Sequence, residues 1–491
     1  MIRTFFLLIS LVIGMAVNSY GNDFVLTPNL QLAYQELTQL KVQHARQLLA
    51  QESPTNGIKI WLDDFADMIV LFATEDEAAY NRLVDQEDER LDLIEKMDNT
   101  SPYNRFIRAE INFHWALVKM KLGHESKGGF NAISAYKLLE ENHKKFPTFS
   151  LNNKSLGLLH VLIGSVPENY RWITRLLGLK GNIQQGLKEL DMATNDKLIG
   201  KEAKFYQLFI QSNILTLNDR ERQEVLDFVH KNPDNLAVSF LGTSISLKDN
   251  KSEQALKIVQ SRPTGSAYLN LPIFDLYQGE IALQKGQYAQ AIKSYQAYLR
   301  AFRGHSFQKD ATYKLALSYW LANNSEQALA YLNRINSIGK KLSEADKNAQ
   351  SFYESFQKTK TFPSKNLLKA RFAFDGGYNT EALDALDELT EANFTNPLEK
   401  VEFNYRKARI YQKINQPNVA ISLYVHAIEL AGNLNTYFAP TSCLQLGYSY
   451  LAKNDKARAR SYFEKALTYK KHEYKNSIDN KAQAALTELG V

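Results

Sequence analysis

Six segments in the second half of the chain share one spacing of small, turn-forming and apolar residues. In each segment a small residue is followed seven positions later by Gly or Asn, five positions after that by Ala, and four further on by a large apolar residue. The turn positions are Asn250, Gly286, Asn323, Gly377, Asn415 and Asn454. Gly and Asn best tolerate the left-handed conformation in which many helices end. The spacing therefore predicts six pairs of antiparallel helices, each joined by a tight turn.

The alanines of this pattern predict where the two helices of a pair cross. They are Ala255, Ala291, Ala328, Ala382, Ala420 and Ala459. A small side chain lets two helix axes approach to roughly 8–10 Å. The large residue four positions later lies on the same helix face and is expected to fill the space between neighbouring pairs.

Turn-forming residues are scarce along the whole chain. Gly and Pro together number 23 + 12 = 35 of 491 residues, or 7%, whereas average usage is roughly 12%. Apolar residues make up 44% of the chain, which is ample for a packed core and argues against disorder along its length. The period-two alternation typical of strands is missing. We therefore expect an all-α fold of antiparallel helix pairs stacked into a superhelical solenoid.

This array is expected to span residues 234–491, with an extra helix near 343–356. One step between successive alanines is 54 residues long, whereas the others are 36 to 39. Ser343 followed by Asp346 is a pattern typical of helix N-termini, in which Asp346 reaches back to the cap. Residues 22–233 show less regular helical patterns, among them one long helix over 29–50. We expect this part to be a degenerate helical-repeat region.

The N-terminus has the three parts of a secretory signal peptide. Arg3 supplies a basic start, residues 5–17 form an apolar run, and the small residues Ser19 and Gly21 fit a cleavage site. We expect residues 1–21 to be removed and the protein to be exported, soluble, and periplasmic or extracellular. An uncleaved N-terminal anchor is the alternative. No cysteine near the cleavage site is present to carry a lipid, and no later run is long enough to predict a transmembrane helix in the mature chain.

Residues that could carry catalysis or bind metal are scattered along the chain. Cys443 is the only cysteine, so neither an intrachain disulfide nor a cysteine zinc site can form. No two of the nine histidines have the four-residue spacing of a helical zinc pair, and no phosphate-loop or hydrolase motif occurs. We expect no enzyme activity, no metal and no cofactor. The net charge of +6 is mild for this length, so we expect no nucleic-acid partner.

The repeated pattern resembles the tetratricopeptide repeat (TPR), a helix-turn-helix unit that stacks into a superhelix. The clearest copy, residues 274–302, carries Gly279, Ala282, Gly286, Tyr288, Ala291, Tyr295 and Tyr298. The spacings between the alanines of successive copies exceed the norm of this family, and the Pro that usually ends a copy is absent from most of them. The resemblance implies a concave groove, lined by the first helix of each pair, in which a protein or peptide segment binds.

In this family the groove residues lie three before, one after and four after the first small position of each copy. These offsets give a candidate partner-binding groove of Tyr313, Trp320, Arg371, Phe374, Tyr405, Arg409 and Tyr448. Arg371 and Arg409 could clamp a carboxylate, with Tyr405 and Tyr448 supplying stacking area. Apolar residues at the same offsets pack between repeats equally well, so core packing is the alternative. The Asn residues of the chaperone-binding carboxylate clamp are absent from these positions.

A shorter stretch, residues 156–187, resembles a family of fungal inclusion-body clearance proteins and their animal TPR relatives. The likeness rests on Leu156, Gly157, Pro167, Gly178 and Gly186 together with the residues between them. It implies helical-repeat architecture and carries no location or activity to this chain. Gly178 is expected to end a helix, and Gly186 to lie at a close helix contact.

Two functions fit these features. The first is an exported, non-catalytic TPR scaffold that binds a protein or peptide segment in its concave groove, in a bacterial envelope complex. The alternative is a glycan or nutrient-capture binding protein of the cell envelope, which exposed Trp and Tyr side chains would favour.

Overall fold

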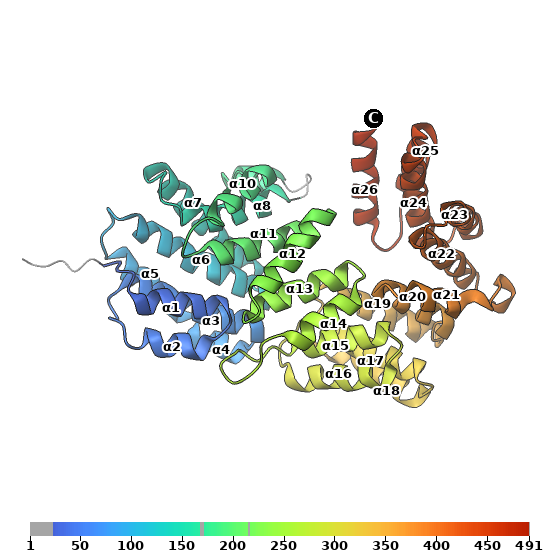
Figure 1. Cartoon of the computed structure of the whole chain (residues 1–491), viewed down its shortest axis with the longest axis horizontal. Helices are drawn as coiled ribbons and strands as arrows, with labels where there is room; N and C mark the ends of the chain where they lie inside the picture. Colours follow the sequence, from blue (N-terminus) through green and yellow to red (C-terminus); the bar gives the residue numbers. More distant parts are fainter. Residues whose placement is uncertain (1–22, 167–170, 215–216, 491) are drawn as a thin grey trace, which may run out of the picture.

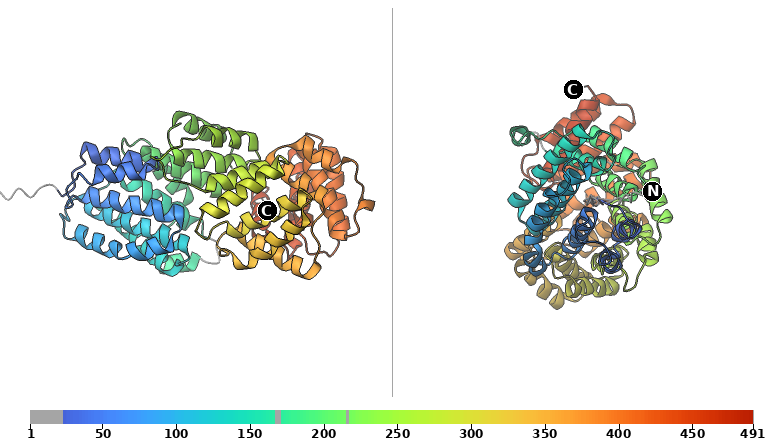
Figure 2. Two further views of the ribbon diagram at one scale, coloured as in Figure 1. Left: turned by 90° about the horizontal axis from the view of Figure 1, so that it is seen from below. Right: turned by 90° about the vertical axis from the view of Figure 1, so that its left-hand side faces the viewer.

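The computed structural model describes residues 23–166, 171–214 and 217–490, and within these ranges the regular structure is helical. The expected all-α fold is therefore confirmed. The proposed signal peptide, residues 1–21, lies outside the described residues. Figures 1 and 2 place the N-terminal helices at one end of the long axis and the last helix pairs at the other.

The N-terminal half packs most of its helices around one large apolar core. Its helices are α1 (Pro28–Thr38), α2 (Val42–Leu49), α3 (Gly57–Thr74), α4 (Glu77–Leu83), α5 (Asp85–Glu95), α6 (Pro102–Leu122), α7 (Glu125–Lys145), α8 (Asn152–Gly164), α9 (Arg171–Leu176), α10 (Ile183–Ala193), α11 (Gly200–Ile214) and α12 (Asp219–Lys231). The largest fully buried side chain is that of Trp61, which packs edge-on against Phe106 of α6.

The prediction of one long helix over 29–50 is wrong, because the chain turns between α1 and α2. Leu40 adopts a left-handed conformation with φ of 65°. Its carbonyl accepts a hydrogen bond of 2.8 Å from the backbone N–H of Leu269, in the loop before α15. At this break the carbonyl of Leu40 is bonded to a residue 229 positions away in the sequence. The local amphipathic pattern cannot reveal such a contact.

The second half consists of six helix pairs, here called the first to sixth repeats. They are α13 and α14 (Leu236–Lys248, Ser252–Ser261), α15 and α16 (Ile273–Gln284, Tyr288–Ala301), α17 and α18 (Gln308–Leu321, Ser325–Arg334), α20 and α21 (Lys365–Gly376, Asn379–Asp387), α22 and α23 (Pro397–Lys413, Pro417–Ala431), and α24 and α25 (Phe438–Ala452, Lys456–Thr468). The helix α19 (Glu344–Thr359) lies between the third and fourth repeats, and α26 (Lys475–Glu488) packs on the sixth.

Each repeat turns where the sequence pattern predicts. All six Gly or Asn positions have φ between 57° and 85°. The six alanines are at most 1% exposed, and the large apolar residue one turn later is fully buried in every repeat. Full burial of a Val, Leu or Phe side chain contributes roughly 1.5–3 kcal/mol, so these positions are a main source of the stability of the array.

The helix α19 interrupts the regular stacking. Asp346 near its start accepts hydrogen bonds from the backbone N–H groups of Phe307 (2.8 Å) and Lys309 (3.0 Å), and so caps the beginning of α17. It also accepts a bond of 2.6 Å from the hydroxyl of Ser343. After this helix the fourth repeat contacts both α15 and α17 through α20. The array therefore folds back on its own second repeat.

The N-terminal half is joined to the array at the loop between α3 and α4. Glu75, with φ of 51°, accepts hydrogen bonds from the backbone N–H groups of His305 (2.8 Å) and Ser306 (2.9 Å). The ammonium of Lys121 lies 2.9 Å from the same carboxylate. Beside this contact an open cleft of about 720 Å³ separates residues 73–77 from the loops around Pro272 and Arg303.

Candidate partner-binding site

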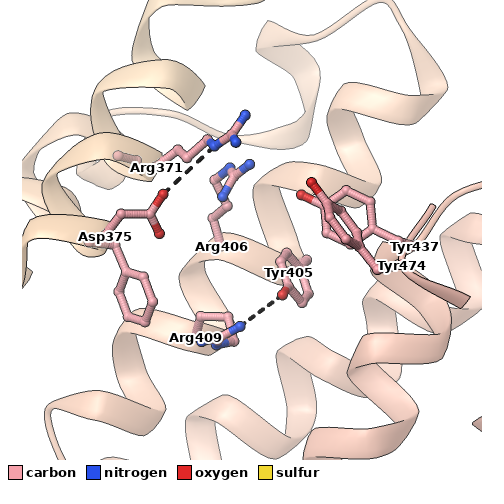
Figure 3. Close-up of a pocket in the computed structure, with 9 residues that line it drawn as sticks. Arg371, Asp375, Tyr405, Arg406, Arg409, Tyr437 and Tyr474 are labelled. Atoms are coloured by element: carbon pink, nitrogen blue, oxygen red, sulfur yellow. Dashed lines mark hydrogen bonds and ion pairs between the residues drawn. The ribbon is translucent and has the colours of Figure 1, made fainter. Parts of the chain in front are cut away.

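A pocket of about 200 Å³ opens between the first helices of the fourth and fifth repeats (Figure 3). The residue before α24 and the residue before α26 close its other side. Its lining residues are Ala370, Arg371, Phe374, Asp375, Tyr405, Arg406, Arg409, Tyr437 and Tyr474. Helical spacing explains the arrangement, because residues three or four positions apart on α20 and on α22 share one helix face.

Three guanidinium groups meet two carboxylates in and beside this pocket. Arg406 forms a hydrogen-bonded ion pair with Glu402 on its own helix, with 2.6 Å between Nε and Oε1. Nε of Arg371 lies 3.8 Å from Oδ2 of Asp375, an ion pair too long for a strong hydrogen bond. The side chains of Arg371 and Asp375 are 36% and 44% exposed, so both are open to a ligand.

Arg409 has no carboxylate partner among the described residues. Its guanidinium donates a hydrogen bond of 2.9 Å to the hydroxyl of Tyr405 and lies 5.0 Å from the ring centre of Phe374. Aromatic faces attract a cation but do not neutralise it. The residues that line the pocket thus include three cations and one anion, and Glu402 beside the pocket pairs with Arg406.

Burial opposes charge on Arg371, but the phenol groups of Tyr313 and Tyr437 and the carboxylate of Asp375 outweigh it and raise the pKa of Arg371. The guanidinium therefore stays protonated. Burial raises the pKa of Asp375, and the attraction of Arg371 and Arg406 offsets this only in part. Burial therefore disfavours the charged form of Asp375, one of the two carboxylates that attract Arg371.

Two tyrosines from the loops complete the rim. The rings of Tyr437 and Tyr474 pack edge to face with centres 5.1 Å apart, and both hydroxyls lie on the side of Arg406 in Figure 3. Tyr474 is 47% exposed and accepts a hydrogen bond of 3.4 Å from the amide of Asn348 on α19. The inserted helix therefore reaches the edge of the pocket.

The structure brings together four of the seven candidate groove residues. Arg371, Phe374, Tyr405 and Arg409 all line the pocket. Tyr448 lies apart, with its ring edge-on to Phe463 at 5.1 Å.

The segment that follows the third repeat covers the remaining two candidates. Tyr313 packs on Phe352 of α19 with ring centres 4.7 Å apart. Trp320 stacks on Phe362 at 4.7 Å and donates its indole N–H to the carbonyl of Pro363 at 3.0 Å. Sequence offsets place these two residues on the groove face, but an inserted segment occupies that face.

Four pocket residues escaped the sequence analysis. Arg406 lies three residues before Arg409, and Asp375 lies four after Arg371, so helical spacing could have found both. Tyr437 and Tyr474 come from loops before helices, where the repeat offsets do not apply. Only the three-dimensional path of the chain brings them to the pocket.

Clustered charged groups in the N-terminal half are structural. Asp64 is buried and accepts hydrogen bonds from Arg90 (3.0 Å), His114 (2.7 Å) and Trp115 (3.0 Å). Lys154 joins α8 to α6 and α11 through Glu110 (2.7 Å) and another glutamate. These groups are paired with one another, and neither of the two pockets described above reaches them. Over the described residues, no grouping of His, Cys, Asp or Glu suits a metal ion.

Cys443 lies in the apolar core of the last repeats and is fully buried. In the described ranges of the chain, none of the helices combines the length and apolar character needed to cross a bilayer.

Comparison with known proteins supports the repeat assignment. Family models described as tetratricopeptide repeat match residues 276–339, 401–434 and 440–473. These ranges cover the second, third, fifth and sixth repeats of the structure. They do not include residues 156–187, so the likeness of that stretch to the fungal clearance family stays a prediction. No curated protein shows a significant match.

Several solved structures resemble the chain. The apo form of the quorum sensor NprR from B. thuringiensis is 14% identical, with 82% of this chain and 98% of that one covered and a TM-score of 0.33. The P58(IPK) TPR domain is 15% identical, with 83% and 96% covered and a TM-score of 0.23. Yeast Tom70 is 13% identical, with 94% and 88% covered and a TM-score of 0.24.

The first and fourth repeats lie outside the matched residues, yet they have the same left-handed turn and the same buried alanine as the others. The matched ranges and the geometry of the array show that the second half of this chain contains tetratricopeptide repeats.

Proposed function

We propose that this protein is a non-catalytic scaffold that binds a segment of a partner protein on the face formed by the first helices of its repeats. An acidic group of the partner enters the pocket around Arg371, Arg406 and Arg409. The observation that carries this proposal is the unbalanced charge of the pocket, in which Arg409 contacts a hydroxyl and an aromatic ring but forms no direct ion pair with a carboxylate among the described residues. A carboxylate would accept bonds from a guanidinium in the paired geometry that makes such contacts strong.

The size of the pocket favours a side chain over a whole small molecule. Pockets that enclose drug-sized ligands measure roughly 300–1,000 Å³, whereas this one measures about 200 Å³. One acidic side chain or chain terminus fits such a volume, while the rest of a peptide lies along the helices. The tyrosines and arginines of the rim belong to the residue types that dominate protein interfaces.

The glycan-capture alternative has less support. It relies on exposed aromatic platforms, and Trp172, Tyr448 and Tyr474 are exposed. The tryptophan expected on the groove face, Trp320, is however covered by Phe362 and Pro363. We further propose that the protein is exported and acts in a bacterial cell envelope, as its N-terminal sequence suggests.

Reversal of the pocket charge tests the scaffold proposal. The double variant Arg371→Glu plus Arg409→Glu should lose specific partners from an envelope-extract pull-down. The matched control is Arg220→Glu plus Arg460→Glu, which changes the net charge equally at side chains that are 89% and 53% exposed. Identical partner lists from wild type, variant and control would show that the pocket does not bind the partners.

A further inference from the structure

Large apolar side chains are exposed together around the short helix α9. Trp172 is 58% exposed, Leu176 is 77% exposed and Leu177 is 38% exposed. Leu162, near the end of the preceding helix α8, is 40% exposed. Single exposed apolar residues are ordinary, but a local group that includes Trp indicates a surface that contacts something other than water.

The same segment is strongly basic. Residues 171–188 contain Arg171, Arg175, Lys180 and Lys188, and no Asp or Glu. The first three side chains are exposed and form no ion pair within the described residues. Arg171 and Arg175 have only weak contacts with backbone carbonyls, at 3.3 Å and 3.5 Å. Within the described part of the chain, cations without an ion-pair partner thus lie in the same segment as the exposed apolar side chains.

The base of this segment is held by close backbone contacts. A side chain at Gly181 would overlap the backbone of Gly164, and one at Gly186 would overlap the carbonyl of Gly157. The backbone N–H of Lys180 donates a hydrogen bond of 3.2 Å to the hydroxyl of Tyr136. The fold thus holds the C-terminal end of the segment against α7 and α8, while Trp172 and Leu176, earlier in the segment, are exposed.

We propose that this segment, residues 171–180, binds the surface of an anionic lipid bilayer. Trp and Leu side chains enter the boundary between headgroups and acyl chains, while Arg171, Arg175 and Lys180 contact lipid phosphates. Trp suits this boundary because its ring is apolar and its N–H is polar. The excess of positive charge over residues 171–188 favours a uniformly anionic surface over a protein surface of mixed charge. This inference does not depend on the peptide-binding proposal.

Quenching of tryptophan fluorescence by brominated lipids tests the proposal directly, because it reports which tryptophan enters the bilayer. Trp61 and Trp115 are at most 2% exposed, and Trp320 is stacked under Phe362. The full chain is mixed with vesicles of brominated phosphatidylcholine that contain or lack phosphatidylglycerol. We expect quenching and a blue shift with phosphatidylglycerol vesicles only, and loss of both in Trp172→Phe.

Variants separate the contribution of the apolar side chains to bilayer binding from that of the positive charges. Leu176→Asp should lower the apparent partition coefficient by about tenfold or more, because the Leu side chain that would enter the bilayer is replaced by a charge. Arg171→Ser plus Arg175→Ser should lower it by about tenfold at low salt. Val419→Asp, at a 42% exposed position on α23, is the control and should not change it.

Quenching confined to Trp172 that depends on anionic lipid, Leu176 and the arginines supports the proposal. The proposal is overturned if Trp172 is not quenched, or if quenching is equal on neutral vesicles or unchanged in Leu176→Asp. It is equally overturned if the segment binds a protein while the vesicles leave Trp172 unquenched. If the vesicles bind through residues outside the segment, Trp172 stays unquenched, and that result also overturns the proposal.

Discussion

The side-chain amide of Asn250 donates a hydrogen bond of 2.7 Å to the backbone carbonyl of Asp375, 125 residues further along the chain. Asn250 is the turn residue of the first repeat, and Asp375 lines the arginine pocket of the fourth. Nearby, the hydroxyl of Tyr378 donates a bond of 2.9 Å to Glu253. The first repeat therefore holds the end of α20, the helix that carries Arg371 and Phe374. Contacts between distant repeats, and not only between neighbours, fix the shape of the pocket.

Removal of the Asn250 side chain should loosen this contact. Asn250→Gly keeps a residue that tolerates φ of 57° but loses the amide, so we expect a local cost of about 1 kcal/mol. Hydrogen exchange of the amides of residues 376–378 should become about fivefold faster. Asn454→Gly is the matched control, because Asn454 has φ of 58°. No change in exchange in Asn250→Gly would show that the contact does not hold α20.

The small residues at the helix crossings should not tolerate a methyl group. Gly447→Ala places a Cβ on the buried ring of Phe463, and we expect a cost of about 1–3 kcal/mol. Gly129→Ala in α7 is the counterpart, since a Cβ there meets nothing within 4 Å. It should gain about 0.5–1 kcal/mol from helix propensity. Thermal unfolding measures both, and a stable Gly447→Ala protein would contradict the crossing geometry.

The joint between the two halves should weaken in acid. Burial alone would raise the pKa of Glu75, but Lys121 and the hydrogen bonds from Ser306 outweigh it and lower the pKa. A carboxyl with a lowered folded-state pKa stabilises the fold above its ordinary pKa near 4, and this contribution is lost as the pH falls through the folded value.

Glu75→Gln should therefore reduce the unfolding free energy by about 1–3 kcal/mol at pH 7 and by less near pH 3. Urea unfolding at both pH values checks this. Glu77→Gln is the control, since Glu77 is 41% exposed and its pairs with Lys340 and His305 are worth little. An equal cost for Glu75→Gln at both pH values would contradict the electrostatic account.

The single thiol should react only when the protein unfolds. Burial raises the pKa of Cys443 to about 12, so almost no thiolate is present at pH 8. We expect no reaction of the native protein with a disulfide reagent over minutes, and one equivalent in guanidinium chloride. Rapid labelling of the native protein would show that the sixth repeat opens readily.

The sequence predicts the repeat array well because each repeat is built from local spacing. Asn323 and Asn415 turn where the spacing places them, and Ala328 and Ala420 lie at the crossings. These requirements hold within one helix pair and do not depend on the rest of the chain.

The candidate site was predicted only in part, because it depends on how separate pairs meet. Arg371 and Arg409 could be placed on one face from their offsets. The covering of Trp320 by Phe362 and the approach of Tyr474 follow from the inserted helix and from the return of the chain after the sixth repeat. No local sequence pattern predicts the covering of Trp320 or the position of Tyr474 at the pocket. The same limit explains the split at Leu40, whose reason is a contact with Leu269.

Site-specific photocrosslinking in the native host tests the central claim that partners bind at the arginine pocket. A benzoylphenylalanine is placed at position 474, on the rim, or at position 419, on the second helix of the fifth repeat, where the native side chains are 47% and 42% exposed. The account predicts a partner adduct from position 474 that disappears in Arg371→Glu plus Arg409→Glu, and none from position 419. Adducts from position 419 alone, or an adduct at 474 that survives the charge reversal, would contradict it.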